Sequence, residues 1–173
     1  MLDPKALIRS IPDFPKPGIV FRDITPLLAH GPAWQETVNR IAEHYRGRID
    51  IVLGIESRGF LIGSAIAYAL GHGIAVVRKP GKLPAATLRT SYALEYGSDA
   101  LEIHQDAFAP GSRVLVVDDL LATGGTAEAA ISLVRQLGGR VVEAAFIIEL
   151  TFLGGRQRLA PCEVFSLVQY DSE

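Results

Sequence analysis

The chain has 173 residues, of which 49% are hydrophobic and 21% charged, a composition that fits one globular domain and excludes a disordered segment. The formal net charge of −2 argues against a nucleic-acid-binding protein with a broad basic surface, so we expect no nucleic-acid partner. Cys162 is the only cysteine, no apolar run reaches membrane-spanning length and no leader-like pattern opens the chain, so we expect a cytoplasmic protein without a membrane partner.

The N-terminal residues predict a short helix and then an extended lead-in. Asp3-Pro4 has the pattern of an N-cap followed by proline at the first helical position, which predicts a helix to about Ser10. Prolines recur between residues 11 and 28, so we expect that range to be extended and free of helix. On residue chemistry alone, this lead-in is either a strap that closes the core or one wall of a ligand pocket.

The next part of the chain predicts a helix and then a strand–helix unit. Apolar residues recur on one helical face after Pro32. Residues 49–55 have the apolar pattern of a core strand, and residues 60–70 that of a helix rich in small residues. Arg58 lies in the polar turn between them, where a guanidinium could pair with a phosphate through two hydrogen bonds. A surface salt bridge with Glu56 or another carboxylate is the alternative.

A basic loop follows the next expected strand, residues 74–77. The loop contains Arg78, Lys79 and Lys82 together with proline and glycine. A solvated surface loop and an anion-binding loop both agree with this composition. The position of the cations directly after a core strand makes anion binding a serious candidate.

Two short alternating runs, residues 90–94 and 100–104, predict an antiparallel hairpin that interrupts the strand–helix rhythm and is a candidate lid. After a further helix, residues 141–150 and 164–169 predict the last two strands, joined by a short helix or irregular turn. Repeated strand–helix units with doubly buried strands indicate a mostly parallel sheet between helices. Ligands of such sheets bind outside the carboxyl ends of the strands.

The stretch from Arg113 to Thr126 carries the clearest chemical signal. It begins with a continuous apolar run, residues 113–117, which predicts a strand buried on both faces. Asp118 and Asp119 stand where this strand is expected to end. A turn of small residues then leads into a helix that extends to about Leu137. Strand, tight turn and helix in this order direct free backbone N–H groups toward an anion.

The turn, residues 122–126, has the composition of a phosphate cradle. Gly124 and Gly125 let a ligand approach the backbone closely. Thr123 and Thr126 offer hydroxyls that can also cap the helix. The chain has neither the Gly-Lys-Ser/Thr triplet nor a helix-opening G-x-G-x-x-G pattern, which mark other phosphate loops. An ordinary turn with an acidic helix start is the competing interpretation.

The adjacent carboxylates need a partner other than phosphate, which they repel. Asp118 and Asp119 could accept hydrogen bonds from sugar hydroxyls or hold water around Mg²⁺. Phosphate, diol and metal together describe a phosphorylated sugar. With its hydrophobic-Asp-Asp-x-x-x-Thr-Gly-Gly-Thr pattern, the stretch resembles the motif by which type I phosphoribosyltransferases bind 5-phosphoribosyl-1-pyrophosphate (PRPP).

This resemblance implies the fold, cofactor and assembly of that family. The fold is α/β, with a mostly parallel twisted sheet flanked by helices, an antiparallel lid hairpin and a small N-terminal base-binding hood. A single domain, residues 1–173, would contain a base-binding lead-in (1–30), a flexible loop and lid (78–108) and a PRPP-binding strand–loop–helix (113–137). Mg²⁺ would be carried by PRPP without a direct protein ligand, and the protein would be a homodimer.

Further stretches resemble the adenine-specific branch of the family: residues 12–26, 56–60, 78–84 and 91–97. They imply transfer of the 5-phosphoribosyl group from PRPP to N9 of adenine, giving AMP and pyrophosphate in purine salvage. One alternative is the same transfer to hypoxanthine, guanine or xanthine, which the adenine-type lead-in disfavours. Another is a PRPP-sensing regulator without catalysis, which the slightly negative charge and the lack of spare length for a DNA-binding module disfavour.

The resemblance also implies which residues form the site. Glu95 would be the catalytic residue and would protonate, or hydrogen-bond, N7 of adenine. The implied substrate-binding residues are Val20, Phe21, Arg22, Arg58, Lys79, Lys82, Tyr96, Asp118, Asp119, Leu120, Ala122, Thr123, Gly124, Gly125 and Thr126.

Within this set, the resemblance assigns different parts of the substrates to different segments. Val20 and Arg22 would meet the edge of adenine largely through backbone groups, with Phe21 and Leu120 as apolar or stacking neighbours. The three cations of the set would hold pyrophosphate, with Lys79 or Lys82 reaching it from either subunit. The turn at residues 122–126 would hold the 5′-phosphate. The two aspartates would serve the ribose hydroxyls and the hydrated Mg²⁺.

Overall fold

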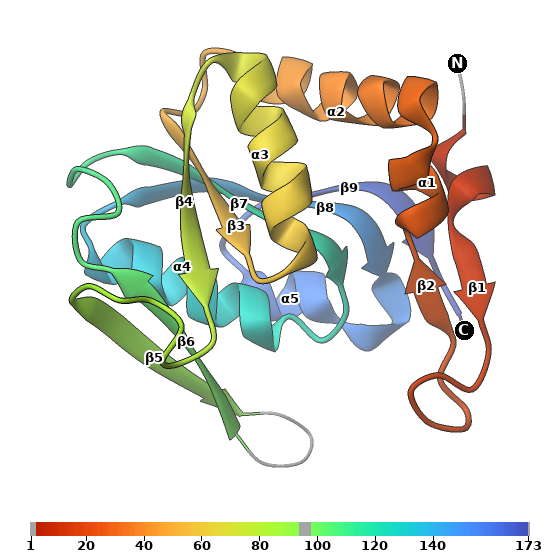
Figure 1. The fold of residues 1–173 in the computed structure, drawn as a ribbon. Coiled ribbons are helices and arrows are strands. Elements are labelled where there is room, and N and C mark those ends of the chain that lie inside the picture. The colour runs from red at the N-terminus through yellow and green to blue at the C-terminus, as the bar shows by residue number, and fades with distance from the viewer. Residues whose placement is uncertain (1–2, 94–97, 173) are drawn as a thin grey trace.

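Seven strands form one mixed sheet in the computed structural model, which describes residues 3–93 and 98–172 (Figure 1). Their spatial order is β5 (Thr87–Ala93), β6 (Ser98–His104), β4 (Gly73–Arg78), β3 (Ile51–Ile55), β7 (Arg113–Leu121), β8 (Arg140–Leu150) and β9 (Val164–Tyr170). Neighbouring strands from β4 to β9 are parallel, whereas β6 pairs antiparallel with β4 and β5. The predicted fold class, with its antiparallel hairpin, is therefore confirmed.

Helices cover both faces of this sheet (Figure 1). One face carries α2 (Gly31–Tyr45) and α3 (Arg58–Leu70), and the other carries α4 (Gly125–Gln136). The short helices Thr151–Leu153 and α5 (Gly155–Leu159) join β8 to β9, and α5 packs beside α4. Within the two described ranges, the structure contains no helix whose length and apolar character would let it cross a lipid bilayer.

The continuous apolar run of β7 supplies both cores. Successive residues of a strand point to opposite faces of the sheet. Val114 and Val116 accordingly pack with the residues of α4, whereas Leu115 and Val117 pack with those of α3. All four are fully buried. Burial on both faces explains why this strand shows no alternation of apolar and polar residues.

The strand order reverses between β3 and β7. The chain passes from β3 to β4 on one side of the sheet and later returns to β7 on the other side. In a parallel sheet, such a reversal opens a crevice at the carboxyl ends of the two strands. Arg58 follows β3 directly, and Asp118 and Asp119 lie near the end of β7. The topology therefore places these side chains at one crevice.

The strand β7 is longer than predicted. Its pairing with β3 ends at Val117, where the expected strand ended, but its pairing with β8 continues to Leu121 opposite Glu149. Asp118 and Asp119 therefore lie inside the strand rather than beyond it. One edge of this part of β7 is thus paired, while the edge beyond the end of β3 is available to the crevice.

The N-terminal segment differs from the prediction in two places. Asp3 does cap a helix, but this is a short 3₁₀ helix, Pro4–Leu7, and the strand β1 (Arg9–Ile11) replaces its predicted continuation. β1 pairs antiparallel with β2 (Phe21–Asp23). The expectation of no helix up to residue 28 is wrong, because α1 spans Thr25–Ala29. Pro26 lies in its first turn, where a missing N–H costs no helical hydrogen bond.

Candidate active site

The turn between β7 and α4 forms a small cradle. Gly124 is the N-cap of α4 and has a φ of 86°, a conformation that favours glycine. The N-cap makes no side-chain hydrogen bond, so the helix cap that Thr123 or Thr126 could have provided is not formed. The backbone N–H groups of the first turn are instead free to meet an anion. A cavity of about 100 Å³ lies here, lined by Asp118, residues 120–127 and Phe146.

Arg58 and the two aspartates meet in the crevice between β3 and β7. Arg58 Nε lies 2.7 Å from Asp119 Oδ2, so Arg58 pairs with this buried carboxylate and not with Glu56. The Arg58 side chain is still 38% exposed, which leaves part of the guanidinium accessible to a ligand. Gly59 is required beside it, because a Cβ there would lie 2.7 Å from the carbonyl oxygen of Val117.

Asp118 lies where a negative charge is unfavourable. Its Oδ1 accepts a hydrogen bond from the backbone N–H of Asp119 at 2.9 Å. Burial, and next the negative charge of Asp119, raise the pKa of Asp118 well above its usual value. A cation or a pair of hydroxyl donors beside Asp118 would relieve this repulsion. The site therefore has the chemistry to accept a sugar diol or a hydrated metal ion next to the cradle.

Glu56 organises the basic loop that follows β4. Its Oε1 accepts hydrogen bonds from Arg78 Nη2 at 3.1 Å and Lys82 Nζ at 2.7 Å, and its Oε2 accepts one from the backbone N–H of Lys79 at 2.9 Å. Burial works to raise the pKa of Glu56, but these hydrogen bonds outweigh it and lower the pKa to about 2. From the sequence, Glu56 was considered only as a partner of Arg58. Its role at the loop depends on contacts with residues 22 to 26 positions later in the chain, which no local sequence pattern predicts.

A chain of polar contacts links the basic loop to the cradle. Lys79 forms an ion pair with Asp99 of β6. Asp99 Oδ2 also accepts a hydrogen bond from the Tyr92 hydroxyl at 3.4 Å. The same hydroxyl accepts one from Thr126 Oγ1, again at 3.4 Å. Tyr92 lies in the stretch 91–97 that resembles the family, but no role was predicted for it, and Asp99 was not singled out in the sequence.

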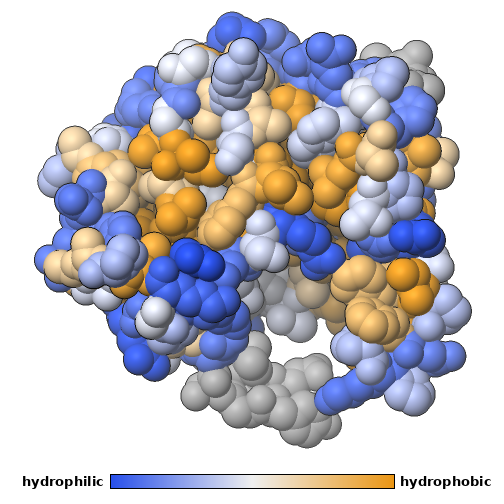
Figure 2. Space-filling model, in the orientation of Figure 1, coloured by the Kyte–Doolittle hydropathy of each residue, from blue (hydrophilic) through white to orange (hydrophobic). Residues whose placement is uncertain are grey.

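The N-terminal segment borders the crevice. The Arg58 guanidinium lies 5.1 Å from the centre of the Phe21 ring, and Phe14 packs edge-on against Phe21 at 5.3 Å. The Arg22 side chain is buried within the segment, where Nη1 donates to Ser10 Oγ at 2.5 Å and the guanidinium lies over the Tyr170 ring. Figure 2 shows a hollow on this face, between the N-terminal segment and the β5–β6 hairpin.

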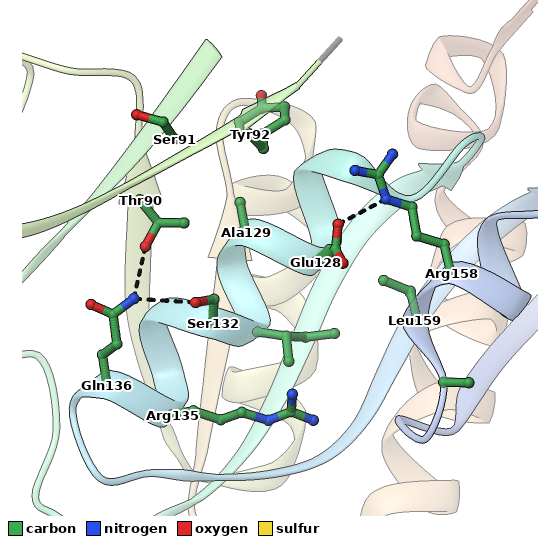
Figure 3. A pocket seen from close by; sticks show the side chains of 12 residues that line it. Thr90, Ser91, Tyr92, Glu128, Ala129, Ser132, Arg135, Gln136, Arg158 and Leu159 are labelled. Carbon is green, nitrogen blue, oxygen red and sulfur yellow. Dashed lines mark hydrogen bonds and ion pairs between the residues drawn. The ribbon is translucent and has the colours of Figure 1, made fainter. Parts of the chain in front are cut away.

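The structure therefore brings most of the predicted residues into one region. Arg58 joins three groups, because it touches Asp119 beside the cradle, faces Phe21 of the N-terminal segment and begins α3 next to Glu56. Val20 lies directly before β2, and Leu120 lines the cradle cavity. Glu95 and Tyr96 lie outside the described residues. A larger groove of about 670 Å³ between β5, α4 and α5 (Figure 3) contains none of the predicted residues.

Comparisons with known proteins identify the family of this chain and agree with its fold. Residues 28–165 match the family model of the phosphoribosyl transferase domain. An adenine phosphoribosyltransferase from Chloroflexus aurantiacus is 59% identical over 169 residues, which cover 97% of this chain and 98% of that protein. The crystal structure of adenine phosphoribosyltransferase from Thermoanaerobacter pseudethanolicus superposes with a TM-score of 0.94 at 51% identity, covering 96% of this chain and 98% of that one. The Saccharomyces cerevisiae enzyme, complexed with adenine and an imino-altritol bisphosphate, gives a TM-score of 0.91 at 42% identity, covering 95% and 96%.

The ion pairs of Glu56 make a prediction about pH. The pKa of Glu56 is about 2 in the folded protein, below the ordinary value of 4.5. The ionised Glu56 side chain therefore stabilises the fold fully above about pH 4.5, and this stabilisation is lost as the pH falls toward about 2. We expect the difference in free energy of unfolding between wild type and Glu56→Gln to shrink between about pH 5 and about pH 2. Chemical denaturation across this range measures it, with the exposed Glu163→Gln as a matched control. A difference independent of pH would contradict the pairing.

Proposed function

The chain belongs to the phosphoribosyltransferase family, and from this premise we propose that it transfers the 5-phosphoribosyl group from PRPP to N9 of adenine. The products are AMP and pyrophosphate, and the enzyme is a pentosyl-transferring glycosyltransferase of purine salvage. One observation carries the proposal beyond the family name. A phosphate cradle, a pair of adjacent carboxylates and the Arg58 guanidinium meet at the crevice between β3 and β7. These are the groups that a ribose bearing a phosphate and a pyrophosphate requires.

Each part of PRPP has a proposed partner. The 5′-phosphate binds the backbone N–H groups of residues 122–126 at the start of α4, and the ribose hydroxyls donate to the carboxylates of β7. Arg58, Lys79 and Lys82 bind the pyrophosphate. Loss of pyrophosphate leaves a transition state with oxocarbenium character, as in glycoside hydrolysis. The cations stabilise the charge that develops on the leaving group.

We propose Mg²⁺ as the cofactor, carried by the substrate. No group of three or more His, Cys, Asp and Glu side chains that could hold a metal occurs in residues 3–93 and 98–172. The donor set fits an ion bound mainly by PRPP oxygens, because Asp119 is engaged with Arg58 and the raised pKa of Asp118 makes it a weak ligand on its own. When bound, the ion would neutralise charge on the pyrophosphate.

The base is proposed to bind under the N-terminal segment. Val20 and Arg22 offer backbone groups to the edge of adenine, and Phe21 and Leu120 offer apolar contacts. Glu95 assists at N7, and Tyr96 is a further substrate-binding residue. Residues 1–30 thus act as the base-binding part of a single domain, 78–108 as loop and lid, and 113–137 as the PRPP-binding unit. The cytoplasm is the proposed location, which the single, unpaired Cys162 supports.

We also propose that the protein is a homodimer and that α3 lies in its interface. Two large side chains of α3 are exposed to solvent: Leu61 is 54% exposed and Tyr68 is 90% exposed. Seven residues apart, they lie on one stripe of the helix with Ala65 between them. Figure 2 shows hydrophobic atoms over the face on which α3 lies. Because Arg58 begins the same helix, an interface here would bring the partner close to the site.

A base-competition assay tests the reaction. With PRPP and Mg²⁺, we expect AMP and pyrophosphate to form from adenine and not from hypoxanthine, guanine or xanthine. Removal of the metal by a chelator should abolish turnover, because the pyrophosphate charge is then left without the ion. Activity on another base would overturn the proposed role of Val20 to Arg22. PRPP binding without turnover of any base would favour a regulator.

The proposed role of Glu95 is tested by Glu95→Gln, which removes the acidic proton but keeps the shape of the side chain. We expect kcat to fall by roughly 10²–10⁴-fold, with a smaller change in the KM for PRPP. Steady-state kinetics measure both values, and Glu163→Gln is the control for loss of a glutamate elsewhere. A kcat close to that of wild type would remove Glu95 from the chemistry.

The proposed interface is tested by Tyr68→Asp, which places a charge on the apolar stripe of α3. We expect the dimer dissociation constant to rise at least about tenfold, because a charge buried in an apolar interface is costly. Analytical ultracentrifugation over a range of concentrations measures it. Asn39→Asp on the exposed side of α2 is the matched control. An unchanged dimer would move the interface away from α3.

A further inference from the structure

The segment that joins β8 to β9 packs against the back of the cradle, backbone to backbone. A Cβ on Gly155 would lie 2.3 Å from the carbonyl oxygen of Ala122 and 2.9 Å from the Leu121 side chain. A Cβ on Gly124 would lie 3.0 Å from the carbonyl oxygen of Gly155. The first of these distances is shorter than side chains tolerate, and backbone atoms cannot rotate away as a flexible side chain can. Two segments far apart in the sequence therefore touch through bare backbone.

An ion pair between a buried carboxylate and a partly exposed arginine holds this segment in place. Glu149, at the end of β8, is 2% exposed, and it accepts hydrogen bonds from Arg156 Nε at 2.9 Å and Nη2 at 2.6 Å. Burial favours a raised pKa for Glu149, but the hydrogen bonds from Arg156 and Ser166 lower it below its usual value, so the pair is ionised. Arg156 Nη1 also donates to the carbonyl oxygen of Val164 at 2.6 Å. Two-pronged pairing of this kind fixes direction as well as distance.

The Glu149–Arg156 ion pair is connected to the cradle through the sheet. Glu149 pairs in register with Leu121, the last residue of β7, and the cradle begins at the next residue. On the other side, Arg158 Nε donates to Glu128 Oε2 in the first turn of α4 at 2.8 Å (Figure 3). The segment that joins β8 to β9 is therefore connected to both ends of the cradle, at β7 and at α4. Its residues do not line the cradle cavity.

We propose that Gly155 and the Glu149–Arg156 ion pair are positioning residues for the 5′-phosphate. They set the path of residues 122–124 from behind and so fix where the N–H groups of the cradle point, without touching the substrate. Phosphate recognition by backbone donors depends on this direction, because small displacements of a binding group are costly. The inference rests on the proposed function, since it names the 5′-phosphate of PRPP as the group that the cradle holds.

The first test is Gly155→Ala, which forces the Ala122 carbonyl to move. We expect the KM for PRPP to rise about tenfold or more, while the KM for adenine changes less than about twofold. Gly31→Ala at the start of α2 is the matched control, because a Cβ there meets no atom within 4 Å and its φ is not positive. Thermal melting of each variant reports global stability. Equal rises in both KM values, or an unchanged KM for PRPP in a folded variant, would overturn the proposal.

The second test is Arg156→Lys, which keeps the charge but loses the two-pronged geometry. This variant tests the positioning role even if Gly155→Ala does not fold. We again expect the KM for PRPP to rise while the KM for adenine changes little. Calorimetric binding of ribose 5-phosphate separates this inference from the reaction. Wild type that binds the probe but turns over no base would overturn the proposed function alone, and weaker binding by the variants would still support the positioning role. Wild-type protein that forms AMP from adenine but does not bind ribose 5-phosphate would overturn the positioning role alone.

Discussion

Two adjacent carboxylates at the end of a buried strand are the constraint on which the site depends. Asp118 and Asp119 repel each other, and burial makes their charge more costly. The protein offsets this with Arg58 on Asp119 and with a backbone N–H on Asp118. Arg58 can reach the strand only because Gly59 lets the start of α3 lie against the Val117 carbonyl. The contact between α3 and β7 thus follows from an electrostatic requirement as much as from hydrophobic packing.

Glycines also allow close backbone contacts around the cradle. At Gly59, Gly124 and Gly155, a Cβ would lie 3.0 Å or less from a backbone oxygen. A residue with a side chain would therefore fit at these positions only if the backbone moved. A site built from backbone contacts has little freedom to adjust, because each contact joins segments that lie in, or directly beside, hydrogen-bonded strands and helices. This rigidity suits the recognition of a phosphate by N–H groups, whose direction must be set before the ligand arrives.

The sequence predicts the parts of the fold that local patterns determine. Residues 113–126 carry their strand, turn and helix in the chain itself, and the resemblance to a known motif rests on them. Predictions failed where the chain interacts with distant segments. The extra length of β7 comes from its pairing with β8. The helix α1 was missed for a local reason instead, since Pro26 lies in its first turn, where proline is tolerated. The partners of Glu56 and the contact of Gly155 with Ala122 join residues far apart in sequence, which no window of the chain reveals.

The three cations proposed to bind pyrophosphate share one arrangement. Each already has a carboxylate partner: Arg58 has Asp119, Lys82 has Glu56 and Lys79 has Asp99. Without these partners, three positive charges in one crevice would repel one another and their long side chains would sample many rotamers. The carboxylates hold the cations in place and keep the crevice close to neutral. Binding of a polyanion then exchanges one set of ion pairs for another, so selectivity depends on geometry rather than on excess positive charge.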